Sequence, residues 1–289
     1  MLKKIIFAGT AQNCERFLPQ VLRNIDLCSK LFSKVAYVFV ENDSIDLTKR
    51  ILGDFGKDKK NYNLITLDGL NKKETIRTLR IALARNTYLK IIKNNLELRE
   101  FDYLLILDLD NVNTYQFKLN TFEEAFCFLE ESNDVAGVFA NQIGTYYDMW
   151  ALRHHKFCPS DIWENVYDYS VLHKVDDESA FKNIFFRRII SINQNEKPIE
   201  VESAFGGLGI YKVNDVFKDD NYYLGYKNKL VINTSGVSVY KKWQVCEHVN
   251  FNMGIRNLNK KLYIFPSLIN GVVSSKNIFN HSAFRKMIF

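Results

Sequence analysis

Cysteine is scarce in this sequence, which has 5 cysteines among 289 residues. They are scattered and odd in number, and no two of them form a C-x-x-C pair: Cys14, Cys28, Cys127, Cys158 and Cys246. This spacing indicates neither a disulfide framework nor a thiolate zinc site. We therefore expect reduced, buried thiols in a cytoplasmic protein.

Long hydrophobic runs are also missing. No window approaches the roughly 18 apolar residues that a membrane-spanning helix needs, and the apolar part of the N-terminus is too short for a signal peptide. The C-terminal tail, 276–289, mixes three positive charges with aromatic and aliphatic side chains. This tail could contact an anionic membrane surface or pack on the domain, and we favour packing. The sequence predicts a protein that is soluble or at most peripheral to a membrane.

The net charge of +6 is not gathered into a dense Lys/Arg block of the kind that nucleic-acid-binding arms carry. A small substrate that bears phosphate fits this charge better than DNA or RNA does. No G-x-G-x-x-G follows the first apolar run, which argues against an oxidoreductase. The absence of a Walker-type sequence or a basic glycine-rich N-terminal loop weakens a nucleotidyltransferase assignment.

What the sequence does contain is a regular alternation of strand and helix patterns. Short apolar or β-branched runs predict strands at 4–8, 35–40, 63–67, 103–107 and 134–140, and another such run, 262–265, ends at Pro266. Helical spacing of apolar residues predicts helices over 14–32, from 47 onward, and over 74–95. Such alternation is typical of an α/β fold with a mostly parallel central sheet flanked by helices.

No repeat, low-complexity segment or linker interrupts the chain. We expect one domain over 1–289, with a donor-binding half at about 1–115, an acceptor-side half at about 116–275 and the tail at 276–289.

Polar residues follow four of the predicted strands at the point where each strand ends: Gly9 and Thr10; Glu41, Asn42 and Asp43; Asp68; and Asp108. Ligands of open α/β sheets bind beyond the carboxyl ends of the strands. A carboxylate at 41–43 could accept hydrogen bonds from a ribose or a base edge. Asp43 or Ser44 could instead cap the helix that follows.

Asp108 and Asp110 form the most informative feature of the sequence. Carboxylates at i and i+2 on an extended chain point to the same side, and oxygen ligands suit Mg²⁺ or Mn²⁺. We predict a metal site here, against the alternative of a solvated loop. His248 could supply a third ligand, although a lone histidine is more often structural.

Arginines Arg77, Arg80 and Arg85 lie on the predicted helix that precedes the Asp108 strand. A guanidinium group can bind phosphate through two hydrogen bonds, so Arg80 and Arg85 are candidate donor-binding residues. A solvated basic helix face is the simpler alternative.

Two later segments place charged residues beside aromatic residues or glycines. Asp148 and Arg153 flank Trp150, and Glu202 precedes the Gly206-Gly207 pair, where a backbone can approach a ligand closely. An ordinary Asp148–Arg153 ion pair and a tight glycine turn would explain the same residues structurally.

Taken together, five blocks in order resemble the family of the cryptococcal capsule-associated α-1,3-mannosyltransferases, which have a GT-A-type fold. The blocks are 40–48, 80–86, 103–110, 147–153 and 203–207. The resemblance covers roughly residues 5 to 250. The sequence departs from the family in two places: we expect no N-terminal membrane anchor of the kind that the fungal members carry, and Glu-Ser-Ala-Phe precedes the glycine pair.

The resemblance implies transfer of a sugar, mannose in the best-known members, from a GDP- or UDP-sugar with retention at the anomeric carbon. It implies that Asp108 and Asp110 hold Mn²⁺ or Mg²⁺ and the donor diphosphate. It also places Glu41, Asn42, Asp43 and Arg85 in the donor pocket, and Asp148 and Arg153 near the reacting sugar. The acceptor would be a glycan or a lipid-linked glycan.

Two questions stay open at the level of the sequence. If the reaction inverts the anomeric centre, a general base is required, and the candidates are Glu202 first and Asp148 second. The chain could also be a non-catalytic sugar-binding module or a nucleotidyltransferase.

Overall fold

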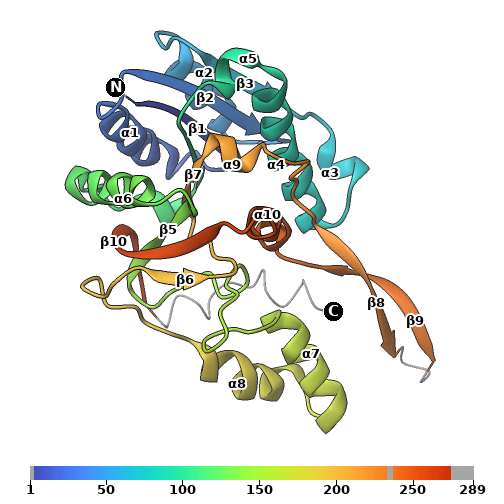
Figure 1. The fold of residues 1–289 in the computed structure, drawn as a ribbon. Coiled ribbons are helices and arrows are strands. Elements are labelled where there is room, and N and C mark those ends of the chain that lie inside the picture. Colours follow the sequence, from blue (N-terminus) through green and yellow to red (C-terminus); the bar gives the residue numbers. More distant parts are fainter. Residues whose placement is uncertain (1–2, 233–236, 275–289) are drawn as a thin grey trace.

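A computed structural model describes residues 3–232 and 237–274 of the chain. Its main sheet has eight strands in the order β3-β2-β1-β4-β7-β5-β10-β6 (Figure 1). The predicted α/β architecture with a mostly parallel central sheet is confirmed. The tail at 276–289 lies outside the described residues.

The first half of the chain forms one edge of the sheet as four parallel strands. They are β1 (Lys4–Ala11), β2 (Lys34–Glu41), β3 (Tyr62–Thr66) and β4 (Tyr103–Asp108). The helices that connect them are α1 (Leu18–Ser29), α2 (Thr48–Gly56), the short α3 (Leu70–Lys73), α4 (Arg77–Asn94) and the short α5 (Leu96–Arg99). All four predicted strands and the three predicted helices are therefore present.

Helices cover both faces of this sheet, which explains why β4 reads as a continuous hydrophobic run. Ile6, Leu104 and Ile106 belong to a core with α4 and α10. Ile5 and Leu105 face the opposite way and belong to a second core with α1 and α6. Alternate residues of one strand thus fill two different cores.

The second half completes the sheet with strands of mixed direction. The strands are β5 (Val135–Gly144), β6 (Ile199–Val201), β7 (Leu208–Lys212) and β10 (Lys261–Val273). β7 lies antiparallel between β4 and β5. The helical elements are η1 (Asn111–Asn113), α6 (Leu119–Glu131), α7 (Ile162–His173), α8 (Asp177–Arg188), α9 (Val213–Val216) and α10 (Glu247–Arg256). A separate two-stranded sheet consists of β8 (Tyr226–Ile232) and β9 (Ser238–Gln244).

The prediction that the apolar run 262–265 ends at Pro266 was wrong, because β10 continues to Val273. The register of β10 against β5 shifts between Ile264 and Ile269. A proline fits at such an irregularity, where its missing N–H leaves no ladder bond unmade.

Candidate functional site

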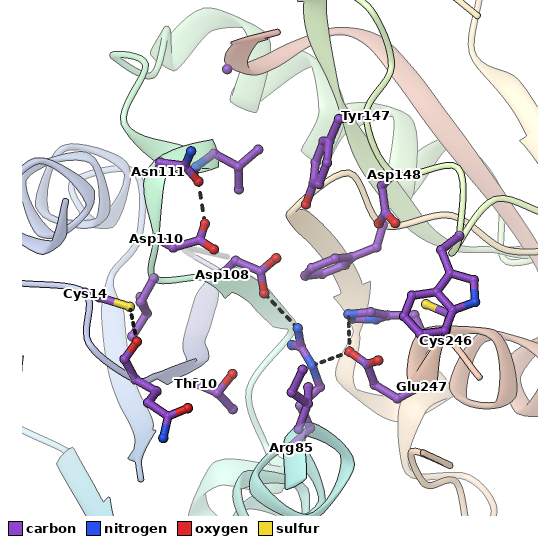
Figure 2. A pocket seen from close by; sticks show the side chains of 18 of the residues that line it. Thr10, Cys14, Arg85, Asp108, Asp110, Asn111, Tyr147, Asp148, Cys246 and Glu247 are labelled. Carbon is purple, nitrogen blue, oxygen red and sulfur yellow. Dashed lines mark hydrogen bonds and ion pairs between the residues drawn. The ribbon is translucent and has the colours of Figure 1, made fainter. Parts of the chain in front are cut away.

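A cleft of about 830 Å³ lies beyond the carboxyl ends of β1, β2 and β4 (Figure 2). Thr10, Asn42 and Asp108 line it from these three strand ends. Its other walls come from α4, from the segment 147–150 and from the start of α10. The predicted edge of the sheet is therefore where this cleft opens.

The carboxylates of Asp108 and Asp110 both line this cleft. Asp108 is held by its backbone N–H, which donates to the carbonyl of Gly207 at 2.9 Å. Asp110 Oδ1 accepts from the Val112 N–H at 3.2 Å at the start of η1. Burial and the nearby charge of Asp108 raise the pKa of Asp110 to about 6. This pair of acids therefore concentrates negative charge that a bound cation would stabilise.

Arg85 forms an ion pair with Asp108 in the wall of the cleft. Its side chain is only 3% exposed, and Nη2 lies 2.7 Å from Asp108 Oδ1 while Nε lies 3.0 Å from Glu247 Oε1. The guanidinium also lies over the ring of Phe205, with 5.1 Å to the centroid. Arg85 thus borders the cleft, as expected for a donor-site residue, but much of its hydrogen-bonding capacity is used within the protein.

Asp148 points into the cleft from the opposite side (Figure 2). Its Oδ1 accepts from the Ala151 N–H at 3.2 Å and its Oδ2 from the Gly206 N–H at 3.1 Å. Burial, together with the charges of Asp108 and Glu247, raises the pKa of Asp148 to about 7 despite these hydrogen bonds. A carboxyl group with such a pKa changes its charge near neutral pH.

His248 lies in the cleft wall at the start of α10, 2% exposed and stacked on Phe205 with 3.6 Å between ring centroids. Within the described chain neither ring nitrogen has a hydrogen-bond partner. Burial and the charge of Arg85 lower the pKa of the imidazole well below its usual value. Burial thus favours the uncharged ring, whose Nε2 lies 3.7 Å from Glu247 Oε1. Among the described residues no donor forms a hydrogen bond to either ring nitrogen.

The glycine pair holds the segments of the site close together. Gly206 and Gly207 have φ of 63° and 80°, where a side chain is strained. A Cβ on Gly206 would lie 2.5 Å from the carbonyl oxygen of Ala140, and one on Gly207 would lie 2.4 Å from the side chain of Val112. The pair thus acts through backbone conformation and close packing.

Several predicted donor residues have structural partners instead of lining the cleft. Asp43 accepts from the N–H groups of Gly69 and Asn71, at 2.6 and 2.7 Å, and these bonds lower its pKa. Asp68 is exposed and pairs with Lys49 at 3.5 Å. Gly9 packs against β4, where a Cβ would meet the Leu107 carbonyl oxygen at 2.6 Å.

Glu41 and Asn42 contain the unpaired polar atoms at the β2 end of the site. Both side chains are buried, and Glu41 Oε1 accepts from the Ser44 N–H at 2.7 Å. Within the described residues, Glu41 Oε2 and Asn42 Nδ2 are buried without a hydrogen-bond partner. Asn42 lines the cleft, and Glu41 is not part of the lining.

Arg80 lines the cleft together with Arg77, one turn earlier on α4. The Arg80 guanidinium donates to the backbone carbonyls of Glu74 and Thr75, at 3.0 and 2.9 Å. The face of α4 that the sequence showed as basic is thus turned toward the cleft.

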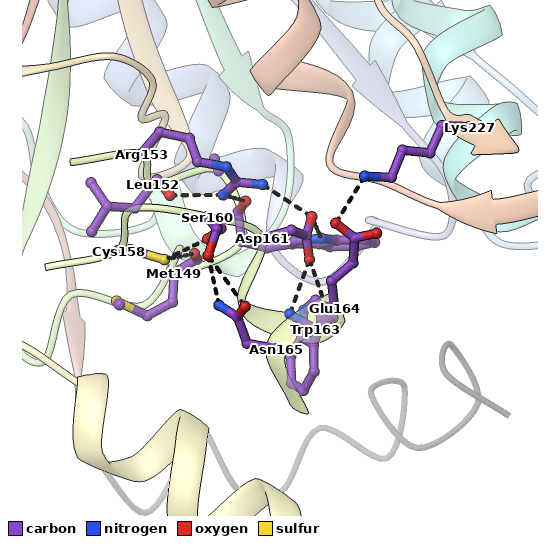
Figure 3. A network of polar contacts seen from close by, with 12 residues as sticks. Met149, Leu152, Arg153, Cys158, Ser160, Asp161, Trp163, Glu164, Asn165 and Lys227 are labelled. Atoms are coloured by element: carbon purple, nitrogen blue, oxygen red, sulfur yellow. Dashed lines mark hydrogen bonds and ion pairs between the residues drawn. The ribbon is translucent and has the colours of Figure 1, made fainter. Parts of the chain in front are cut away.

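The structure separates Arg153 and Glu202 from the cleft lining. Arg153 pairs with Asp161 at 3.0 Å, and Trp150 Nε1 donates to the same Asp161 oxygen at 3.1 Å (Figure 3). Glu202 forms an ion pair with Arg256 at 3.0 Å and its side chain is 51% exposed. Arg153, a candidate donor-binding residue, therefore pairs with Asp161 outside the lining, and the alternative of an Asp148–Arg153 ion pair is not formed either.

Other cleft residues were not selected from the sequence: Gln12, Cys14, Tyr147, Trp163, Glu247 and Val272. Tyr147 and Glu247 are the sequence neighbours of Asp148 and His248, so the sequence indicated their segments but not the residues themselves. Gln12 and Trp163 carry no local pattern that distinguishes them from ordinary loop or helix residues.

In the described ranges, no group of three or more His, Cys, Asp and Glu side chains converges as a metal site. The pair Asp108 and Asp110 nevertheless fits a hard divalent cation. The described contacts engage Oδ1 of each carboxylate, which leaves the Oδ2 atoms for a ligand. A cation held by two carboxylates and substrate phosphates is the usual arrangement for Mg²⁺.

No family model matches the sequence. Plasminogen-binding protein PgbB of Helicobacter pylori (strain J99) is 25% identical over 205 residues, which cover 63% of this chain and 37% of that protein. Two solved structures share the fold. Mannosyltransferase PcManGT from Pyrobaculum calidifontis, in complex with GDP-Man and Mn²⁺, has a TM-score of 0.51 at 13% identity over 99% of this chain. S. aureus TarS has a TM-score of 0.50 at 15% identity over 96% of this chain.

The fold is of the GT-A glycosyltransferase type. The chain spans 60% of PcManGT and 38% of TarS, which is less than two thirds of either structure. The GT-A assignment explains why the cleft opens at the carboxyl ends of β1, β2 and β4. Among the described residues, no helix combines the length and the apolar character needed to cross a bilayer.

Proposed function

We propose that this GT-A chain is a metal-dependent glycosyltransferase that moves a hexose, with mannose favoured, from a nucleotide-sugar donor to a glycan or glycolipid acceptor with retention. The observation that carries the proposal is the pair Asp108 and Asp110 at the end of β4, both facing the cleft. The complex of PcManGT with GDP-Man and Mn²⁺ supports the choice of sugar and metal.

The donor nucleoside would lie at the end of the cleft near β1 and β2. Thr10, Gln12 and Asn42 line this end, and the amide of Asn42 has a buried N–H₂ with no partner in the described chain. A buried donor without a partner is costly, so an acceptor on a base or ribose would be favoured there. Arg77 and Arg80 lie where their charge can attract the diphosphate.

Asp108 and Asp110 would hold the divalent cation. His248, the third ligand suggested by the sequence, does not converge with them as a metal site in the described structure. The bound cation would offset the negative charge that develops on the departing nucleoside diphosphate. Arg85 would keep Asp108 oriented through the 2.7 Å contact. This role differs from the direct phosphate contact suggested by the sequence.

Asp148 is the protein group that would act on the reacting sugar. Its ionised form would stabilise positive charge at the anomeric carbon in a retaining reaction. In the alternative, inverting reaction, the same carboxylate would accept the proton of the acceptor hydroxyl. Of the two candidate bases, Asp148 lines the cleft while Glu202 is paired with Arg256 outside the lining, which favours Asp148.

We expect Asp148→Asn to lower turnover by about 10²-fold or more, the usual range both for loss of a group that stabilises transition-state charge and for loss of a general base. Glu202→Gln, the matched control, should stay within about twofold because its partner Arg256 lies away from the cleft. Because the pKa of Asp148 is about 7, kcat/KM of the wild type should fall as the pH drops below that value. An unchanged rate in Asp148→Asn, or a large loss in Glu202→Gln, would reverse this assignment.

The proposed activity itself is tested by incubating the purified protein with Mn²⁺ or Mg²⁺ and a panel of GDP-, UDP- and CMP-sugars. We expect one class of donor to raise the melting temperature only when metal is present, and slow nucleotide release from that donor. A GDP-sugar response would support mannose transfer. If the folded protein shows neither a thermal shift nor nucleotide release with any donor, a non-catalytic sugar-binding module is favoured. Pyrophosphate release from a nucleoside triphosphate would favour a nucleotidyltransferase.

We also propose that the protein is cytoplasmic and that it does not bind nucleic acid, because its substrate would be a small nucleotide-sugar. Peripheral membrane contact through the tail concerns residues outside the described ranges.

A further inference from the structure

Strands β8 and β9 form an antiparallel arm that extends away from the body of the molecule (Figure 1). The arm is a two-stranded sheet separate from the main sheet. Two-stranded ribbons are marginal in water by themselves, so the arm requires support from other parts of the protein or from a partner.

One face of the arm is supported by α7. Lys227 pairs with Glu164 at 2.8 Å and Lys229 pairs with Asp168 at 2.9 Å; Figure 3 shows the first of these contacts. The ring of Trp243 packs edge-on against Tyr167, with 5.0 Å between centroids. These contacts fix the part of the arm that is nearest to the body.

The opposite face carries an exposed apolar pair farther along the arm. Leu230 and Tyr240 are directly opposed across the two strands, and they are 54% and 78% exposed. They alternate with Lys229 and Lys241, so they point away from the face that meets α7. Large apolar side chains grouped on an exposed strand pair indicate an interaction surface.

Lysines follow this apolar pair on the side toward the body. The next two cross-strand pairs are Lys229 with Lys241 and Asn228 with Lys242. Lys242 lies over the ring of Tyr226 at 4.8 Å, and in the described parts of the chain neither Lys241 nor Lys242 forms an ion pair. Residues 226–244 contain four lysines and no acidic residue. In its described residues the arm is therefore apolar farther out, and closer in it carries Lys241 and Lys242, whose charges are not offset as those of Lys227 and Lys229 are by α7.

We propose that this arm binds the surface of an anionic phospholipid membrane. Leu230 and Tyr240 enter the boundary between headgroups and acyl chains, and Lys241 and Lys242 remain among the lipid phosphates. The order of side chains along the arm favours a membrane as the partner. A bilayer has charged headgroups at its surface and hydrocarbon beneath them, and an arm that enters it has its apolar residues farther out than its lysines. A nucleic acid would use the lysines but would leave the aliphatic Leu230 without a role.

The arm is connected directly to the cleft wall. β9 ends at Gln244, and Cys246, Glu247 and His248 line the cleft just beyond it. Trp163 of α7, the helix that supports the arm, also lines the cleft. Membrane binding through the arm would thus hold the cleft close to a lipid-borne acceptor. The binding itself goes beyond the proposed activity and does not depend on it.

The test is flotation of the full chain with vesicles of phosphatidylcholine alone or mixed equally with phosphatidylglycerol. We expect flotation only with the anionic vesicles, and loss of binding at high salt because the lysine–phosphate attraction is screened. Lys241→Glu/Lys242→Glu and Leu230→Ser/Tyr240→Ser should each reduce the bound fraction by about tenfold. Lys72→Glu/Lys73→Glu, an equal charge change on exposed α3, should stay within about twofold.

A second measurement separates the arm from other surfaces. Tyr240→Trp adds a fluorescent reporter on the arm to the three tryptophans of the chain, and we expect the emission of the variant minus that of the wild type to shift to the blue when anionic vesicles are added. A chain that ends at Ser274 should still bind, which distinguishes the arm from the tail at 276–289. Absence of flotation, flotation that the arm variants leave unchanged, or an unshifted reporter would overturn the proposal. Each variant is first checked for an unchanged far-UV spectrum.

Discussion

Replacing Asp110 with Asn is expected to abolish metal-dependent turnover, with a loss of about 10²-fold or more. The amide can still accept the hydrogen bond from Val112 N–H, so the change removes charge and preserves local structure. The raised pKa of Asp110, about 6, reflects burial beside Asp108. Neutralising it relieves repulsion in the metal-free protein, so the melting temperature should stay equal or rise.

This combination of lost activity with retained stability is what distinguishes a ligand-binding acid from a structural one. Donor-dependent thermal shift with and without Mn²⁺ measures the binding part, and nucleotide release measures turnover. Asp58→Asn is the matched control, since Asp58 is exposed in the turn between α2 and β3. Near-normal turnover in Asp110→Asn would contradict the assignment of the metal site.

The largest expected effect on stability is that of Arg85→Met. Arg85 lies buried between Asp108 and Glu247, at 2.7 and 3.0 Å. Its removal leaves two acids without their cation in a largely desolvated place, which costs about 3–5 kcal/mol of unfolding free energy. Urea denaturation at pH 8 measures this loss.

Arg80→Met serves as the control on the same helix. The Arg80 guanidinium contacts only backbone carbonyls among its hydrogen-bond partners in the described residues, so we expect a change of about 1 kcal/mol or less. Adding Glu247→Gln to Arg85→Met should recover part of the loss, because one of the uncompensated charges is removed. If Arg85→Met unfolds within about 1 kcal/mol of the wild type, the ion pairs do not stabilise the fold.

The strands of the first half could be predicted because their signal is local. β1, β2 and β4 are buried on both faces, so each is a short, nearly continuous apolar run. The polar residues that end them mark the edge of the sheet where ligands bind in such folds. The prediction of Asp108 in the cleft required no long-range information beyond the parallel direction of these strands.

The helices and strands of the second half were harder to predict. α7 and α8 have mixed surfaces, and the antiparallel position of β7 between β4 and β5 depends on pairing between residues about a hundred positions apart. In the β8–β9 arm the polar and the apolar residues occur in blocks, so its sequence lacks the apolar alternation of a half-buried strand.

The sequence by itself determined the α/β alternation, the strand ends and the Asp108–Asp110 pair, because each depends on spacing within one segment. Only the tertiary structure decided which charged residues have partners within the protein. It paired Arg85 with Asp108 and Glu247, turned Glu202 toward Arg256, and brought Asp148 to Gly206. Such pairings depend on how distant segments of the chain pack. The charge of a side chain alone does not specify its partner, because the partner is set by which opposite charges the fold brings within contact distance.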